Sequence, residues 1–212
     1  MKLIAGNINN LFAYHLYKNK FHAFLFLLIS LAKRLHMKYC LSLLFALVVY
    51  TSNAQNDSVP TLKSILLEQL KTTHNVKDWF VPPTIAVAGL TAEQANWKDG
   101  SDNHSIAQLT THLIFWNKQI LDKFVGVKPD AFSGDNKETF SPVTEASWNA
   151  TVQRLDSVLT ALEEVVKTAD DKKLAAIAST VAHIGTHNAY HTGQILYIRK
   201  QQGSWDSEKG VK

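Results

Sequence analysis

The segment that governs the fold reads His183-Ile-Gly-Thr-His187-Asn-Ala-Tyr-His191-Thr-Gly-Gln-Ile-Leu-Tyr-Ile-Arg199. It carries three of the nine histidines of the chain, spaced four residues apart. Positions four apart on a helix differ in direction by only about 40°, so His187 and His191 face the same side. Apolar residues recur along that side at helical spacing, namely Ile177, Val181, Ile184, Ile195 and Ile198. The spacing therefore predicts a helix that presents two imidazoles within its apolar face.

Two readings of this histidine pair stay open at this point. A single buried histidine is more often a core residue whose hydrogen bonds are satisfied than a metal ligand. Two neutral rings side by side are harder to satisfy, because each needs its own partner. A shared metal ion solves both problems at once, as in other helical His-x-x-x-His sites.

Helical periodicity extends through the chain beyond residue 59. Apolar residues recur at steps of three or four, and no segment alternates with period two for long enough to suggest a sheet. Long helices are expected from Pro60 to about His74, from Ser105 to about Val125, from Thr144 through Val166, and from within Leu174–Thr180 to about Gln202. Shorter helical stretches are expected at 81–90 and 91–97, and Trp205 in the polar tail could fold back. Four amphipathic helices with long connections predict an all-α protein, a four-helix bundle.

The distribution of charge argues against nucleic-acid binding. The chain has 22 basic and 18 acidic residues, a net charge of +4. The first 54 residues hold six Lys or Arg and no Asp or Glu, which leaves 16 basic against 18 acidic residues beyond them. A domain of nearly balanced charge has no electrostatic reason to bind a phosphate backbone, so no nucleic-acid partner is expected.

The basic N-terminus is typical of a targeting sequence. Met37-Lys38 precedes an apolar run from Tyr39 to Tyr50, and small residues lead to Ala54. This pattern predicts a signal peptide at 37–54 with cleavage after Ala54, an exported domain at 55–212, and an upstream extension of doubtful start at 1–36. The apolar runs are shorter than the roughly 20 residues that span a bilayer, so the mature form should have no stable span. An uncleaved, membrane-anchored N-terminus is the alternative.

The cysteine content limits the chemistry. Cys40 is the only cysteine and lies in the expected signal peptide. The domain at 55–212 therefore has no disulfide, no thiolate nucleophile and no sulfur ligand. Any metal must be held by nitrogen and oxygen atoms.

His112 is the candidate for a third ligand, because it lies beside the apolar stripe of the second predicted helix. Ser105-Ile-Ala-Gln-Leu-Thr-Thr-His112-Leu-Ile-Phe-Trp116, together with His187-Asn-Ala-Tyr-His191-Thr-Gly-Gln-Ile195, resembles the DinB/YfiT-like family of four-helix metalloproteins. The resemblance covers essentially all of residues 59–205. In that family a histidine on the second helix and a His-x-x-x-His on the last helix bind one divalent metal. The resemblance thus implies His112, His187 and His191 as ligands.

The remaining histidines of the domain fit the pattern less well. His183 lies one turn before His187 but at the edge of the apolar stripe, where a surface or supporting role is expected. His104 is expected to cap a helix or lie in a loop, reaching the site only if the 98–104 loop folds over it. His74 is interpreted as a polar residue near the end of the first helix. Tyr190 is expected to pack, since it projects about 100° away from His191.

The resemblance implies three possible functions. The first is a metal-dependent hydrolase-like enzyme acting on a small molecule. The second is a metal-dependent S-transferase that uses a low-molecular-weight thiol, and the third is a non-catalytic metal-binding or stress-associated protein. Imidazole ligands are compatible with zinc or nickel, the expected ions, and with iron or copper. A homodimer is also implied, and no residue of the sequence is assigned as a general base.

Overall fold

The computed structural model describes residues 25–27, 29–31, 33, 39 and 59–211. The chain divides into two units, Met1–Ser58 and Val59–Lys212. In the first unit the described residues are helical, and the expected cleavage site after Ala54 lies outside them. No helix among the described residues is both long enough and apolar enough to cross a membrane.

The second unit is built from helices and connecting loops. Its α-helices are α2 (Leu62–Thr72), α3 (Pro83–Val87), α4 (Ala92–Asn96), α5 (Ile106–Val125), α6 (Glu145–Thr168) and α7 (Asp171–Gln201). Two short 3-10 helices, η1 (Asn136–Thr139) and η2 (Ser207–Lys209), follow α5 and α7. The described residues contain no strand, so the prediction of an all-α protein is confirmed.

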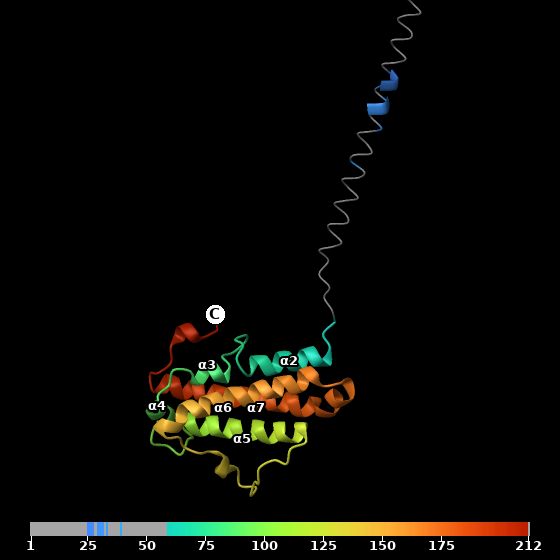
Figure 1. Ribbon diagram of the computed structural model, residues 1–212. Helices are drawn as coiled ribbons and strands as arrows, with labels where there is room; N and C mark the ends of the chain where they lie inside the picture. Colours follow the sequence, from blue (N-terminus) through green and yellow to red (C-terminus); the bar gives the residue numbers. More distant parts are fainter. Residues whose placement is uncertain (1–24, 28, 32, 34–38, 40–58, 212) are drawn as a thin grey trace, which may run out of the picture. The chain divides into compact units, whose positions relative to one another are not determined.

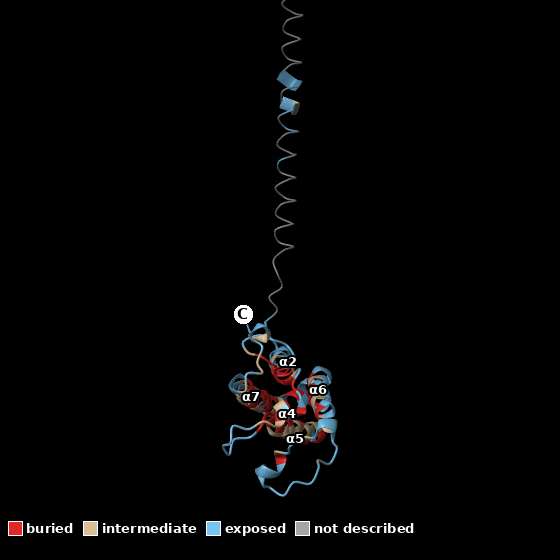
Figure 2. Ribbon diagram, turned by 90° about the vertical axis from the view of Figure 1, so that its left-hand side faces the viewer, coloured by how far each residue is buried: buried red, intermediate tan, exposed pale blue. Residues whose placement is uncertain are grey.

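The longer helices pack with their apolar stripes inward. Helix α2 contacts α6 and α7, and α5 contacts the same two helices. Seen end-on, α2 and α5 therefore lie at opposite corners, with α6 and α7 between them (Figures 1 and 2). One buried cluster includes Leu113, Leu155 and Ile195, and a second includes Leu70 and Val166. The red inner faces in Figure 2 mark this interior.

Side-chain caps fix where the helices begin. Ser105 starts α5 with a capping box, in which its hydroxyl accepts from the Gln108 N–H and the Gln108 side chain accepts from the Ser105 N–H. Such reciprocal bonds satisfy backbone donors that the first helical turn leaves free. The expected start of the last helix within Leu174–Thr180 is wrong, because Asp170 caps α7 by accepting from the Lys173 N–H.

The chain beyond α7 folds back through Trp205, as the sequence suggested. Trp205 packs against the first buried cluster, and the Arg199 guanidinium lies 5.3 Å from the centre of its ring. Arg199 is itself buried and donates to the carbonyls of Ala86, Ala88 and Ser204. These bonds tie the end of α7 to α3 and to the tail.

Candidate metal centre

The structure brings three histidines from two helices together. His112 comes from α5, and His187 and His191 come from α7. One ring nitrogen of each lies within 4.8 Å of those of the other two, and the Nε2 atoms of His112 and His187 are 3.2 Å apart. His112 and His191 are buried, and His187 is half-buried. No other group of three His, Cys, Asp or Glu side chains in the described chain meets in this way.

A buried pair of amides fixes the register of α5 against α7 beside the histidines. The Asn117 amide donates to Asn188 Oδ1 at 2.7 Å, and the Asn188 amide donates back at 3.2 Å. Both side chains are almost completely buried, so each depends on the other for hydrogen bonding. Since Asn188 directly follows His187, this pair holds the last helix where its imidazoles meet His112.

The second nitrogen of two rings is already engaged. The Thr139 hydroxyl donates to the Asn136 carbonyl at 2.7 Å, so it can only accept from His112 Nδ1, which lies 2.6 Å away. His191 Nδ1 lies 2.6 Å from the side-chain amide oxygen, Oε1, of Gln194. In both rings Nδ1 therefore carries the proton and Nε2 keeps a lone pair, as expected of a histidine that binds a metal.

The outer nitrogen of the third ring, His187, differs from those of the other two. His187 Nδ1 is buried and has no hydrogen-bond partner among the described residues. If His187 donates from Nε2 to His112, its Nδ1 lone pair stays unsatisfied inside the protein. A divalent ion that took the Nε2 lone pairs of all three rings would replace the contact between the Nε2 atoms of His112 and His187, and Nδ1 of His187 would then carry the proton of its ring. The donor set, three nitrogens and no sulfur, suits such an ion.

Burial keeps these rings uncharged near neutral pH. Desolvation, with the neighbouring histidines second, lowers the pKa of His112 from 6.5 to about 3. Desolvation and then His191 lower the pKa of His187 from 6.5 to about 4. Desolvation also lowers the pKa of His191, and its bond to Gln194 opposes the shift. Neutral imidazoles keep the lone pairs that metal binding requires.

His104 directly precedes the Ser105 cap of α5, and one aromatic ring lies between its imidazole and that of His112. Its ring stacks on Phe140 with centroids 3.7 Å apart, and Phe140 stacks on His112 at 4.0 Å. Two rings that both stack flat on Phe140 must lie on its opposite faces, so Phe140 separates the two imidazoles. Partial burial, followed by the charge of Lys98, lowers the pKa of His104. Phe140 lies in an irregular connection, and no pattern in the sequence predicts its position between His104 and His112.

His183 and Tyr190 lie outside the three-histidine cluster. His183 is exposed, and its Nδ1 lies 2.7 Å from the Ser179 carbonyl of the preceding turn. Tyr190 is exposed rather than packed, so that expectation was wrong. Its ring edge meets the His191 ring with centroids 4.9 Å apart, and its hydroxyl accepts from the Gln194 amide at 3.4 Å.

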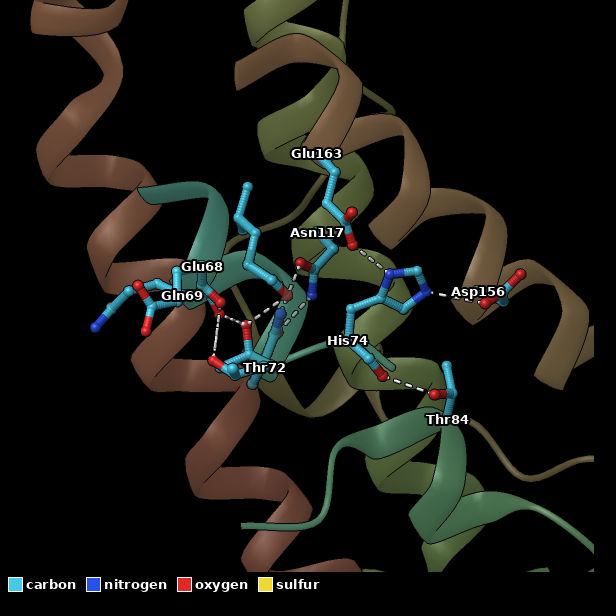
Figure 3. A network of polar contacts seen from close by, with 11 residues as sticks. Glu68, Gln69, Thr72, His74, Thr84, Asn117, Asp156 and Glu163 are labelled. Carbon is cyan, nitrogen blue, oxygen red and sulfur yellow. Dashed lines mark hydrogen bonds and ion pairs between the residues drawn. The ribbon is translucent and has the colours of Figure 1, made fainter. Parts of the chain in front are cut away.

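His74 has a larger role than the end of a helix indicated. It is only 2% exposed, and its Nδ1 and Nε2 lie 2.5 and 2.9 Å from carboxylate oxygens of Glu163 and Asp156 on α6 (Figure 3). Its carbonyl accepts from the Thr84 hydroxyl at 2.7 Å. His74 therefore joins the segment after α2 to α6 and α3, a role that the sequence analysis missed.

Comparison with known proteins identifies one family. The family model described as the DinB superfamily matches residues 84–195, just over half of the chain. The matched segment contains all three clustered histidines. Searches of curated proteins and of solved structures returned no match.

Proposed function

This chain belongs to the DinB superfamily, and from that premise we propose that it is a metalloprotein of the four-helix DinB/YfiT-like type. We propose that His112, His187 and His191 bind one divalent ion, zinc or nickel in preference to iron or copper. The activity that we propose for this centre is a metal-dependent, hydrolase-like reaction on a small molecule.

One observation carries the proposal. Three neutral imidazoles converge in the interior without a carboxylate or a thiol, and two of them have Nδ1 engaged so that Nε2 faces the shared point. A cluster whose function was only structural would be expected to pair its ring nitrogens within the protein, as His74 does. Here Nε2 of His112 and Nε2 of His187 face each other at 3.2 Å instead.

The ion would supply Lewis-acid chemistry. Held by three neutral ligands, a divalent ion keeps its full charge, polarises a carbonyl group and lowers the pKa of water toward about 7. The protein's own residues do the positioning. Thr139 and Gln194 hold the His112 and His191 rings in the tautomer that offers Nε2.

Hydrolysis is favoured over thiol transfer by the proposed location of the protein. We propose that residues 37–54 are an export signal cleaved after Ala54, and low-molecular-weight thiols are found mainly in the cytosol. An S-transferase remains the alternative because the domain has no cysteine of its own, so a thiol cosubstrate would meet no competing protein thiolate.

Metal analysis and turnover test the proposal together. The purified wild-type chain should contain about one divalent ion per molecule, as the three-nitrogen donor set predicts. His191→Ala should contain almost none, and the control His183→Ala should match the wild type. Equal metal in His191→Ala and wild type would disprove the ligand assignment.

The reaction is tested on the same sample. Metal-dependent turnover of a panel of esters, amides and phosphoesters would support hydrolysis. Conjugation of a thiol to monochlorobimane would support the transferase instead, and silence in both assays would favour a non-catalytic metal-binding protein. Export predicts that secreted material begins at Gln55, and an intact Met37 or Met1 would contradict it. The implied homodimer stays a prediction that the mass of the protein in solution can test.

A further inference from the structure

A cavity of about 560 Å³ lies beside the histidine cluster, between α7 and the loop that includes Trp97 and His104. Pockets that hold small molecules typically measure about 300–1,000 Å³. Six α7 residues line it, each one or three positions after the previous one: Tyr190, Gly193, Gln194, Tyr197, Ile198 and Gln201. They therefore form one continuous stripe along the helix.

Gly193 is the least expected member of this stripe. A glycine inside an exposed helix destabilises it relative to alanine, because its backbone loses more freedom on folding. A close neighbour can explain such a glycine, but a Cβ built on Gly193 meets no atom within 4 Å beyond its own helical surroundings. By contrast, a Cβ on Gly185 would touch Thr73 at 3.7 Å. The space above Gly193 is thus open cavity.

The walls of the cavity combine aromatic rings with neutral amides. The rings are Trp97, Tyr190 and Tyr197, and the amides are Asn103, Gln194 and Gln201. Aromatic rings supply large rigid apolar faces, and amides both donate and accept hydrogen bonds. The Gln194 and Gln201 amides already donate to the hydroxyls of Tyr190 and Tyr197, which orders the stripe.

The charges of the lining disfavour an anion. Lys98, Asp99 and Asp102 contribute one positive and two negative charges. The carboxylate of Asp99 is occupied by the backbone N–H and the hydroxyl of Ser101, which also lowers its pKa. In the metal-free chain an anionic compound would meet more negative than positive charge among the lining residues, and an uncharged compound would meet no repulsion.

Three lining residues connect the cavity to the clustered histidines. Gln194 accepts from His191, the ring edge of Tyr190 meets the His191 ring, and His104 reaches His112 through the Phe140 stack. A smaller groove of about 250 Å³ borders His187 on the other side. That groove is mostly apolar, with Trp116, Ile120 and Ile184 among its lining residues, and it offers few groups to orient a polar compound.

We infer that the cavity along α7 is the recognition site for the substrate, and that this substrate is an uncharged, ring-bearing compound with several hydrogen-bonding groups. The inference rests on the proposed function for the word substrate, whereas binding to the cavity can be tested without metal. The ring would lie against the aromatic side chains over Gly193, and the amides would bind its polar groups.

The test follows ¹H–¹⁵N spectra of the full chain, metal-loaded and metal-free, during titration with 4-nitrophenyl β-glucoside. Methyl β-glucoside and 4-nitroacetanilide separate a sugar ring from an aryl ring, and 4-nitrophenyl phosphate tests the charge. Saturable shifts of the Trp97 indole N–H and the Gly193 amide are expected with at least one uncharged compound. Shifts absent with all three uncharged compounds, or equally strong binding of the phosphate by the metal-free chain, would overturn the inference.

Two matched variants locate the site. Gly193→Leu fills the cavity and should weaken binding by about tenfold or more, since a single misplaced group in a pocket has effects of this size. Thr180→Leu fills the smaller groove and should leave binding unchanged. Gly193→Ala, which removes the helix penalty, checks that the position tolerates a side chain, and metal content should stay at the wild-type level in every variant. Weakened binding in Thr180→Leu alone would overturn the assignment. A chain that binds these compounds but no metal would refute the proposed function and not the cavity.

Discussion

Two histidine sites lie in the same helical unit: His74 alone, and the group of His112, His187 and His191. They differ in what surrounds their rings. His74 sits between two carboxylates of α6, one on each ring nitrogen. The rings of His112, His187 and His191 meet one another instead, with only a hydroxyl and an amide oxygen at their outer nitrogens. The first group is complete within the protein, and the second is not.

The difference follows from the chemistry of the partners. Both ring nitrogens of His74 are engaged by carboxylate oxygens, so neither is free to bind a metal. A ring that donates once, to Thr139 or Gln194, keeps its other lone pair. Burial alone therefore does not distinguish a ligand from a structural histidine; the number of acceptors around the ring does.

Removing the metal should produce the largest change and should affect only the three-histidine centre. An ion that binds the folded chain and not the unfolded chain stabilises it by about 4 kcal/mol when the free ion is about 1,000 times its Kd. Chelation should lower the thermal unfolding midpoint of the wild type accordingly. His191→Ala should unfold at the same temperature with and without chelator. A wild type that is indifferent to chelation would erase the contrast between the two groups.

Replacing His74 should give the next largest effect, on stability alone. His74→Ala deletes a buried ring together with its hydrogen bonds to Glu163 and Asp156, and hydrogen bonds to charged groups contribute about 1.5–3 kcal/mol. Urea unfolding should show this loss while the metal content stays unchanged. Asp156→Asn is the matched control: Asp156 is 57% exposed, so its replacement should cost less than about 1 kcal/mol. Loss of metal in His74→Ala would show that the two groups are not independent.

The sequence predicted the His187–His191 pair because its pattern is local, whereas His112, 75 positions away from His187, was implied as a ligand by the family resemblance. His187 and His191 are one helical turn apart. Apolar residues at helical spacing predicted the helix that carries them, most of α7, and likewise α5 and α6. His74 could not be recognised in this way, because its partners lie 82 and 89 residues further along the chain. Only the packing of α2 against α6 brings them together.

Two other features were missed for similar physical reasons. The Asn117–Asn188 pair joins residues 71 positions apart, and a buried asparagine gives no signal in a pattern of apolar residues. The expected start of α7 is too late because the apolar stripe begins at Leu174, the first buried residue of the helix, whereas the cap lies four residues earlier, at Asp170. Aspartate is a favoured N-cap residue, so Asp170 marks the start of α7 although it precedes the apolar stripe.

Mild acid should give the smallest effect and should separate the groups by protonation. In the unfolded chain each histidine takes up a proton with a pKa near 6.5, whereas in the folded chain the pKa of His112 is about 3 and that of His187 about 4. Because these pKa values are lowered by folding, the unfolded chain binds more protons below pH 6.5. The metal-free protein must therefore lose stability as the pH falls.

Between about pH 7 and about pH 6 the loss should be about 1 kcal/mol for the two rings together. It should grow until both rings are protonated in the folded chain as well, His187 near pH 4 and His112 near pH 3. Urea unfolding of the metal-free protein measures it. The double variant His112→Gln/His187→Gln should remove most of the slope, because it removes the groups that are neutral only when folded. A slope of the opposite sign would mean that the folded chain holds these rings in their charged form. Charged rings have no lone pairs to offer an ion, so the contrast with His74 would be lost.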